Sequence, residues 1–247
     1  MGDEIEPPTK KRHGTEGFTW EVYAIAFVIS GLVFLIGIFI GINITKSSVS
    51  DIEDSIYTLN DNTMSLQVLT LTSSDPGLFC NVYRELSDKF EEESWKIGEQ
   101  IDYLEQQRGV SDLRLKSQYS NLEFRNFMLV RLANERCNGS FIPILYFYSN
   151  NKDVCPHCFQ QGTELFMARK ELLAKNMSVR IYSFDGDLDN IAIDVLKKQF
   201  NVSSYPTIVI GNTVYRGMMN KDEIVRAVES EVSTNEQIKP SDALRQP

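Results

Sequence analysis

Cys155-Pro156-His157-Cys158 stands between an apolar run, Ile142–Tyr148, and a stretch with helical periodicity. A strand that leads into two cysteines at a helix start is a setting typical of thiol–disulfide chemistry. The unpaired N–H groups and the dipole of a helix N-terminus stabilise a thiolate. Pro156 suits a first helical turn because it has no N–H to satisfy there, and His157 can place positive charge near the Cys155 sulfur. The motif therefore predicts a redox pair in which Cys155 is the reactive thiol.

Two other interpretations of the motif stay open. Cys-x-x-Cys is also half of a zinc site, but a complete site needs two further ligands. The candidates for them are Cys80, Cys137 and His157 itself, since His13 precedes a long apolar segment. The pair could also be a purely structural disulfide. We expect the redox pair, with no metal and no cofactor beyond the two sulfurs.

A second motif lies further along the chain. Tyr205-Pro206-Thr207 stands directly before the strand-like Ile208-Val209-Ile210. A proline at the head of a strand is tolerated and suggests a special turn, such as one with a cis peptide bond.

With these two motifs and a strand and helix between them, the chain from about Phe141 to Ser233 resembles the thioredoxin superfamily. The resemblance implies an α/β, thioredoxin-like fold: a central mixed sheet flanked by helices, in the order strand–helix–strand–helix–strand–strand–helix. It also implies residue roles. Cys155 is the attacking thiol and Cys158 the resolving thiol. Pro206 is the cis-proline, and Tyr205 and Gly217 help to bind the substrate backbone.

The Pro-His dipeptide between the cysteines resembles DsbA-type oxidases, which implies a quinone-linked membrane redox partner. Two features depart from that comparison. The interval from Cys158 to Pro206 is too short for the helical insertion of DsbA. Ser149 stands six residues before Cys155, where many members of the superfamily keep a buried acid, so the proton acceptor for Cys158 is unassigned.

The N-terminal part contains a candidate membrane anchor. Val22 to Ile44 carries no charge and would be about 34 Å long as a helix, enough to cross a bilayer. A cleaved signal peptide is the alternative, but its apolar region would be shorter and the residues after Ile44 make a poor cleavage site. The basic cluster Lys10-Lys11-Arg12 precedes the segment, which predicts a cytoplasmic N-terminus and an extracytoplasmic remainder in the cell membrane. Gly37-x-x-x-Gly41 would allow a homodimer through this helix.

Composition and export limit the other partners. The chain is 42% hydrophobic and 24% charged, with a formal charge of −9 and no basic patch, so we expect no nucleic acid. Outside the cytoplasm disulfides persist, so the four cysteines fit two pairs. Sequons for N-glycosylation occur at Asn138, Asn176 and Asn201.

A helical region separates the anchor from the redox motif. Apolar residues from Val49 to Leu66 recur every three or four positions, which suits either a helix packed in a core or a coiled-coil stalk. Two longer helical patterns follow, one from Ser74–Gly77 to Arg108 and one from Ser111-Asp112 to Asn134. Packed antiparallel, they would bring Cys80 and Cys137 together as a structural disulfide worth roughly 4 kcal/mol on the chain-entropy account. The alternative is two buried free thiols.

The expected domains are a cytoplasmic tail (1–21), a transmembrane helix (22–44), an extracytoplasmic helical region (45–138), a thioredoxin-like domain (139–233) and a disordered tail (234–247). The expected function is that of a membrane-anchored thiol:disulfide oxidoreductase, an oxidant or isomerase acting on exported cysteine-containing proteins. A membrane-tethered reductase for one client and a non-enzymatic binding or scaffold module are the two alternatives.

Overall fold

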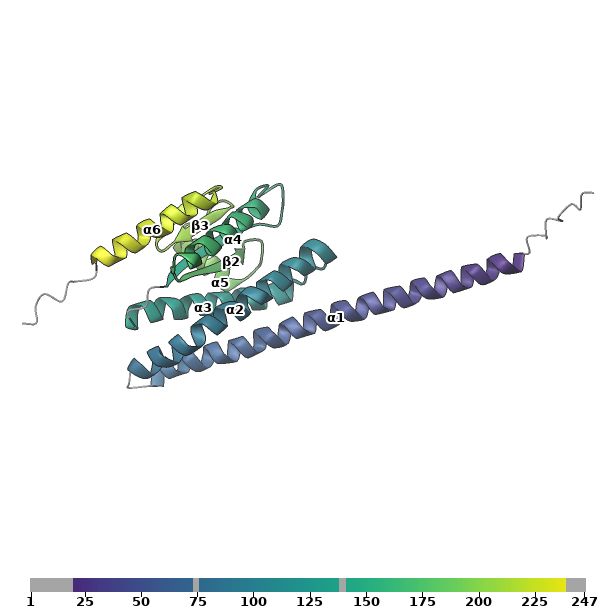
Figure 1. The fold of residues 1–247 in the computed structure, drawn as a ribbon, viewed down its shortest axis with the longest axis horizontal. Coiled ribbons are helices and arrows are strands. Elements are labelled where there is room, and N and C mark those ends of the chain that lie inside the picture. Colours follow the sequence, from purple (N-terminus) through teal and green to yellow (C-terminus); the bar gives the residue numbers. More distant parts are fainter. Residues whose placement is uncertain (1–19, 73–75, 138–140, 239–247) are drawn as a thin grey trace, which may run out of the picture. The chain divides into compact units, whose positions relative to one another are not determined.

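The structure, a computed structural model, describes residues 20–72, 76–137 and 141–238. The basic cluster at 10–12, the sequon at Asn138 and the residues after 238 lie outside this part. The elements follow in chain order (Figure 1): α1 (Trp20–Thr72), α2 (Pro76–Arg108), α3 (Leu113–Arg136), β1 (Ile142–Tyr148), α4 (Cys158–Ala174), β2 (Val179–Asp185), α5 (Ile191–Gln199), β3 (Thr207–Ile210), β4 (Thr213–Arg216) and α6 (Lys221–Ile238). The helix α6 thus continues to Ile238, past the end expected at Ser233.

The chain divides into two compact units, residues 1–50 and 51–247. The first unit holds the apolar part of α1, and one stretch within Trp20–Thr70 has the length and apolar composition needed to cross a membrane. Its large apolar side chains are exposed, among them Phe27 (80%) and Phe39 (70%). The helix α1 continues without a break to Thr72, so it also contains the helical stretch expected from Val49 to Leu66.

The second unit is built on a four-stranded sheet in the order β2-β1-β3-β4. β1 runs parallel to β2, with Ile144 opposite Ile181, and antiparallel to β3, with Leu145 opposite Val209. β3 and β4 form a hairpin around Gly211, which has a positive φ of 58°. This mixed sheet, with its order of strands and helices, is the thioredoxin-like arrangement that the sequence predicts.

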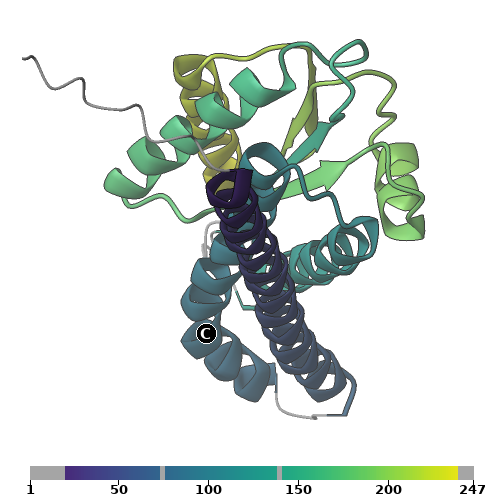
Figure 2. The same ribbon diagram turned by 90° about the vertical axis from the view of Figure 1, so that its right-hand side faces the viewer.

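Both faces of β1 are buried, because each face packs against a different helical layer. Ile144 and Tyr146 belong to one core with residues of α4 and α6. Leu145 and Phe147 belong to the other core with residues of α3 and α5. Figures 1 and 2 show α4 and α6 together on one side of the strands and α3 and α5 on the other. A strand buried on both faces reads as an unbroken apolar run, which is how β1 appears in the sequence.

The helix α3 is part of the core that surrounds the sheet. Phe127, Leu129, Val130 and Ala133 of α3 are buried in the same cluster as the strands. The expected boundary at residues 138 and 139 therefore does not separate two independent cores. The fold of residues 51–247 includes the helical region.

Several contacts fix the pairing of α2 with α3. The side chain of Asp112 caps α3 by accepting the backbone N–H groups of Arg114 and Leu115, both at 3.0 Å. A disulfide joins Cys80, near the start of α2, to Cys137, the C-cap of α3, so the two helices run antiparallel. Where they cross, Gly98 allows a close approach, since a Cβ there would lie 2.7 Å from the Tyr119 hydroxyl.

The last turns of α1 also belong to the core of this unit. Ile52, Ile56 and Leu59 are each only 2% exposed within the single chain, and Thr63 is fully buried. The apolar periodicity of this segment therefore reflects packing inside the unit, as one of the two sequence interpretations has it.

A buried glutamate from α3 satisfies the open edge of β2. Glu123, 2% exposed, accepts the backbone N–H of Ser183 and shares a hydrogen bond with Tyr119. The Tyr119 hydroxyl also donates to the carbonyl of Ser94, at 3.1 Å. Burial, the largest cause, raises the pKa of Glu123 well above its ordinary value of 4.5, which favours the neutral carboxyl.

The helix α2 extends this protection of the β2 edge. Arg180 of β2 pairs with Asp88 of α2 at 2.9 Å and lies 3.7 Å from Glu91. Trp95 of α2 stacks on Phe166 of α4, with ring centroids 5.9 Å apart. The helix thus passes the sheet edge and reaches the layer on the opposite face.

We expect Glu123→Ala to lower the free energy of unfolding by about 1–3 kcal/mol, because it leaves the Ser183 N–H and the Tyr119 hydroxyl without their buried partner. Glu123→Gln should cost less than about 1 kcal/mol, because the amide is neutral, like the protonated carboxyl, and can still accept from Ser183. Urea unfolding of both variants tests this. Equal losses in the two variants would contradict a neutral carboxyl at this position.

The same group predicts a pH dependence. Because folding raises the pKa of Glu123, the folded chain keeps a proton that the unfolded chain loses above about pH 4.5. The contribution of Glu123 to stability is therefore complete below that pH and declines as the pH rises towards the folded pKa. Glu123→Gln should flatten this part of the curve when unfolding is measured between pH 4 and 8.

Candidate active site

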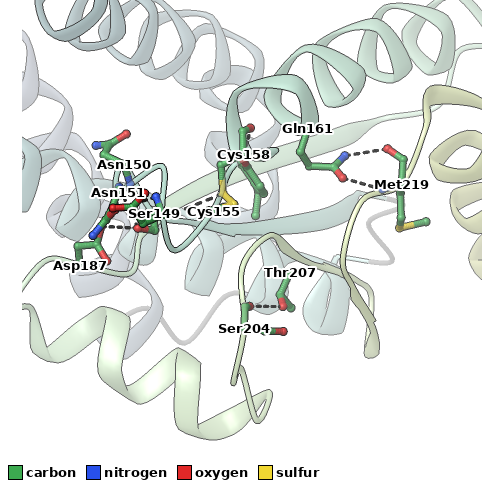
Figure 3. Close-up of a disulfide and its surroundings, with 12 residues drawn as sticks. Ser149, Asn150, Asn151, Cys155, Cys158, Gln161, Asp187, Ser204, Thr207 and Met219 are labelled. Atoms are coloured by element: carbon green, nitrogen blue, oxygen red, sulfur yellow. Dashed lines mark hydrogen bonds between the residues drawn. A yellow bond between two sulfur atoms is a disulfide. The ribbon is translucent and has the colours of Figure 1, made fainter.

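The two motif cysteines form a disulfide with Cα atoms 5.4 Å apart (Figure 3). Cys155 and Cys158 are 3% and 6% exposed. The helix α4 begins at Cys158, three residues later than the sequence predicts, so Cys155 lies in the turn before it. The Cys155 N–H donates to the carbonyl of Asn151 at 2.8 Å and fixes that turn. His157 is the N-cap residue of α4, and Pro156 and His157 are both exposed beside the disulfide.

The carboxyl end of β1 supports the second cysteine. The Tyr146 hydroxyl donates to the Cys158 carbonyl at 2.6 Å, and the Ser149 N–H donates to the Cys158 sulfur at 3.5 Å. Burial raises the pKa of Tyr146, so its hydroxyl stays a donor. Because β1 is buried on both faces, it gives the Cys158 sulfur a rigid support.

The proline loop reaches the same end of the sheet. The Tyr205–Pro206 peptide bond is cis, as the strand-head proline suggested. Thr207 begins β3 opposite Phe147 of β1, so Pro206 lies where β1 delivers the cysteine motif. The Tyr205 side chain is half-buried and its hydroxyl donates to the Gly186 carbonyl at 3.3 Å. The Tyr205 side chain is therefore held against the loop that follows β2.

Gly217 and Gln161 connect this loop to the active-site helix. The Gly217 N–H donates to the Pro206 carbonyl at 2.9 Å, and its φ of 87° is one that glycine adopts without strain. Gln161, fully buried one turn after Cys158, accepts the Met219 N–H at 2.7 Å and donates to the Met219 carbonyl at 3.0 Å. One amide side chain thus fixes the segment after β4 to α4.

Exposed apolar side chains flank the disulfide. Val154 precedes Cys155 and is 51% exposed, and Phe159 follows Cys158 and is 73% exposed. Val154, the exposed Pro156 and Phe159 thus place apolar surface beside the two sulfurs, which suits contact with a polypeptide chain.

A buried charge cluster lies behind the loop that follows β1. Lys116 of α3 bridges Glu105 of α2, at 3.0 Å, and Asp185 at the end of β2. The Asn150 side chain donates to Asp185 at 3.0 Å, which ties the loop to the cluster. Burial and the Glu105 charge raise the pKa of Asp102 at its margin.

The structure brings together the residues predicted from the two motifs and places Cys80 and Cys137 apart from them, in the α2–α3 pair. It adds Gln161, Ser149 and Asp187, whose roles the sequence did not indicate. A polar residue on the inner face of α4 was the available signal for Gln161. For Asp187 it was a carboxylate in the loop after β2, beside the end of β1. In the part of the chain that the structure describes, no group of three His, Cys, Asp or Glu side chains forms a metal site.

Comparisons with known proteins give similar folds only. No protein-family model matches the chain, and no curated protein matches it. Thioredoxin-2, described as a component of malaria parasite protein secretion machinery, is 20% identical over 36% of this chain and 82% of its own, with a TM-score of 0.30. Chloroplastic thioredoxin z is 19% identical over 42% and 88%, with a TM-score of 0.32. The first thioredoxin domain of mouse protein disulfide-isomerase A4 is 24% identical over 47% and 79%, also with a TM-score of 0.32. The fold assignment rests on the strand order and the loop placement described above.

Loss of the Gln161 side chain should destabilise the site. We expect Gln161→Ala to lower the free energy of unfolding by roughly 2 kcal/mol, because it leaves the buried N–H and carbonyl of Met219 unpaired. Gln161→Glu should lower the free energy of unfolding by less than Gln161→Ala does, since a carboxylate still accepts from the Met219 N–H but cannot donate to the Met219 carbonyl. Chemical unfolding monitored by circular dichroism gives the order, and a neutral Gln161→Ala would contradict it.

Proposed function

We propose that this protein is a membrane-anchored, extracytoplasmic thiol:disulfide oxidoreductase that oxidises thiols to disulfides, or isomerises disulfides, in exported proteins. The observation that carries the proposal is the Cys155–Cys158 disulfide at the start of α4, next to the cis-proline loop. The exposed Val154 and Phe159 beside it support a polypeptide substrate.

The reaction is an exchange of disulfides. A substrate thiolate attacks the Cys155 sulfur, the Cys155–Cys158 bond breaks, and its electron pair leaves on the Cys158 sulfur. A second substrate thiolate then attacks the mixed disulfide, which releases Cys155 as a thiolate and leaves the substrate oxidised. Tyr205, Pro206 and Gly217 would hold the substrate backbone against the sulfurs. The redox-active disulfide would be the only prosthetic element.

The favoured direction is oxidation. His157 lies two residues from Cys155, and the N-terminus of α4 begins beside it. Both features favour a Cys155 thiolate, and a stable thiolate makes the reduced enzyme the preferred state. Turnover would then need an electron acceptor, for which a quinone-linked membrane partner is suited. The reductase alternative predicts a reduction potential near that of thioredoxin, so equilibration with glutathione buffers separates the two directions.

Substitution of the two motif cysteines tests the activity. We expect Cys155→Ser to abolish oxidation of a reduced test protein, and Cys158→Ala to accumulate mixed disulfides that can be isolated and identified. The double variant Cys80→Ala/Cys137→Ala is the matched control, because it removes two sulfurs outside the site. It should be less stable and still active. If Cys155→Ser retains activity, the binding-module alternative replaces the enzyme.

The anchor has a separate test. The full chain should stay with membranes after washing with high salt and alkaline carbonate, because the apolar part of α1 crosses the bilayer. A chain beginning at Lys46 should be released into the soluble fraction. Protease added to cells whose wall has been removed and whose membrane is intact should digest the unit of residues 51–247. Protection of that unit would place the redox site in the cytoplasm and remove the proposed location.

A further inference from the structure

The resolving cysteine needs a route for its proton. The Cys158 sulfur is buried, and a buried thiol in apolar surroundings keeps its proton more tightly than a free one. The Cys158 sulfur accepts a hydrogen bond from the Ser149 N–H at 3.5 Å (Figure 3). This contact is made by the backbone N–H and places Ser149 beside Cys158.

The Ser149 side chain leads away from the sulfur to a carboxylate. Its hydroxyl, in a residue only 3% exposed, donates to Asp187 at 2.6 Å and accepts the Asn151 N–H at 3.1 Å. Asp187 also accepts the Asn150 N–H at 3.2 Å, and lies in an exposed position in the loop after β2. A serine hydroxyl that binds a carboxylate can pass a proton outward, because it receives one as it donates its own.

The other groups near the sulfur do not fit this role. The hydroxyl proton of Tyr146 is committed to the Cys158 carbonyl, and burial keeps that group protonated. Asp185 and Glu105 are paired with Lys116. Asp185 also accepts a hydrogen bond from the Asn150 side chain. The charged groups next to Asp187 are Asp185, which accepts the Asp187 N–H at 3.0 Å, Asp189 two residues on, and Lys197, which donates to the adjacent Gly186 carbonyl at 3.1 Å.

We propose that Asp187, acting through the Ser149 hydroxyl, accepts the proton of Cys158 when this thiol attacks a mixed disulfide on Cys155. This rests on the proposed function. In the step, the Cys158 sulfur forms the bond to Cys155, the substrate sulfur leaves with the electron pair of the mixed disulfide, the Ser149 oxygen takes the thiol proton and the Ser149 proton passes to the Asp187 carboxylate. In the oxidising direction the same atoms return the proton to the departing Cys158 thiolate.

The test uses the reduced full-length protein and an aromatic disulfide, dithiobis(nitrobenzoate). Its attack by Cys155 releases one equivalent of coloured thionitrobenzoate, and attack by Cys158 on the resulting mixed disulfide releases the second. We expect Asp187→Asn and Ser149→Ala to slow only the second release, by about 100-fold at pH 7. The defect should shrink as the pH approaches the pKa of a free thiol, where the solvent removes the proton. Ser149→Thr, which keeps the hydroxyl, should restore the rate.

Asp189→Asn is the matched control, because it removes the same charge two residues along the same loop and should leave both releases unchanged. Thermal unfolding of each variant shows whether it is folded. An Asp187→Asn protein whose second release is as fast as that of the wild type, or slowed equally at every pH, would falsify the relay while the proposed function stands. A wild-type protein that never releases the second equivalent would remove both.

Discussion

The burial of β1 on both faces is the constraint on which the rest of the site depends. One strand supplies the base of the resolving cysteine through Tyr146 and Ser149, and pairs with β3, which carries the proline loop. The Pro206 carbonyl of this loop accepts the Gly217 N–H, and Gln161 of α4 binds the backbone of Met219, after β4. These contacts link β1, the proline loop, the segment after β4 and α4 to one another. A sheet strand packed between two helical layers has little freedom to shift, so this geometry is set before any substrate arrives.

The α2–α3 pair makes a structural contribution that a flexible spacer would not. It covers one face of the sheet with α3 and satisfies the edge of β2 through Glu123 and through the contacts of α2 with Arg180. The Cys80–Cys137 disulfide closes this pair over a sequence separation of 57 residues, a constraint worth about 4 kcal/mol on the chain-entropy account. The two disulfides therefore lie in different settings: one joins α2 to the end of α3, and the other lies at the start of α4.

The strands and the helices of the redox part could be predicted from the sequence because their patterns are local. The apolar run of β1, the cysteines at a helix start and the proline before β3 each describe one element. Pairings across the chain were harder. The meeting of Cys80 with Cys137 followed from an antiparallel arrangement of the two helices. The contact of Ser149 with Asp187 joins two loops, and the contact of Glu123 with Ser183 joins a helix to a strand edge. No periodicity encodes such pairs, since each depends on how the layers pack. The sequence places the start of α4 at Cys155, but the helix begins at Cys158. The residues from Cys155 to His157 would suit a first helical turn equally well, so the sequence does not distinguish that turn from the one observed.

The position of Glu123 at the rim of the sheet has a consequence for dividing the chain. A fragment that begins at residue 141 would keep every residue of the redox motif, but it would lose the helices that cover β2. The backbone groups of this strand would then be free to pair with the same strand of another molecule. Such a fragment is a candidate for aggregation, so the smallest soluble piece of this protein should begin at the helical layer and not at the first strand.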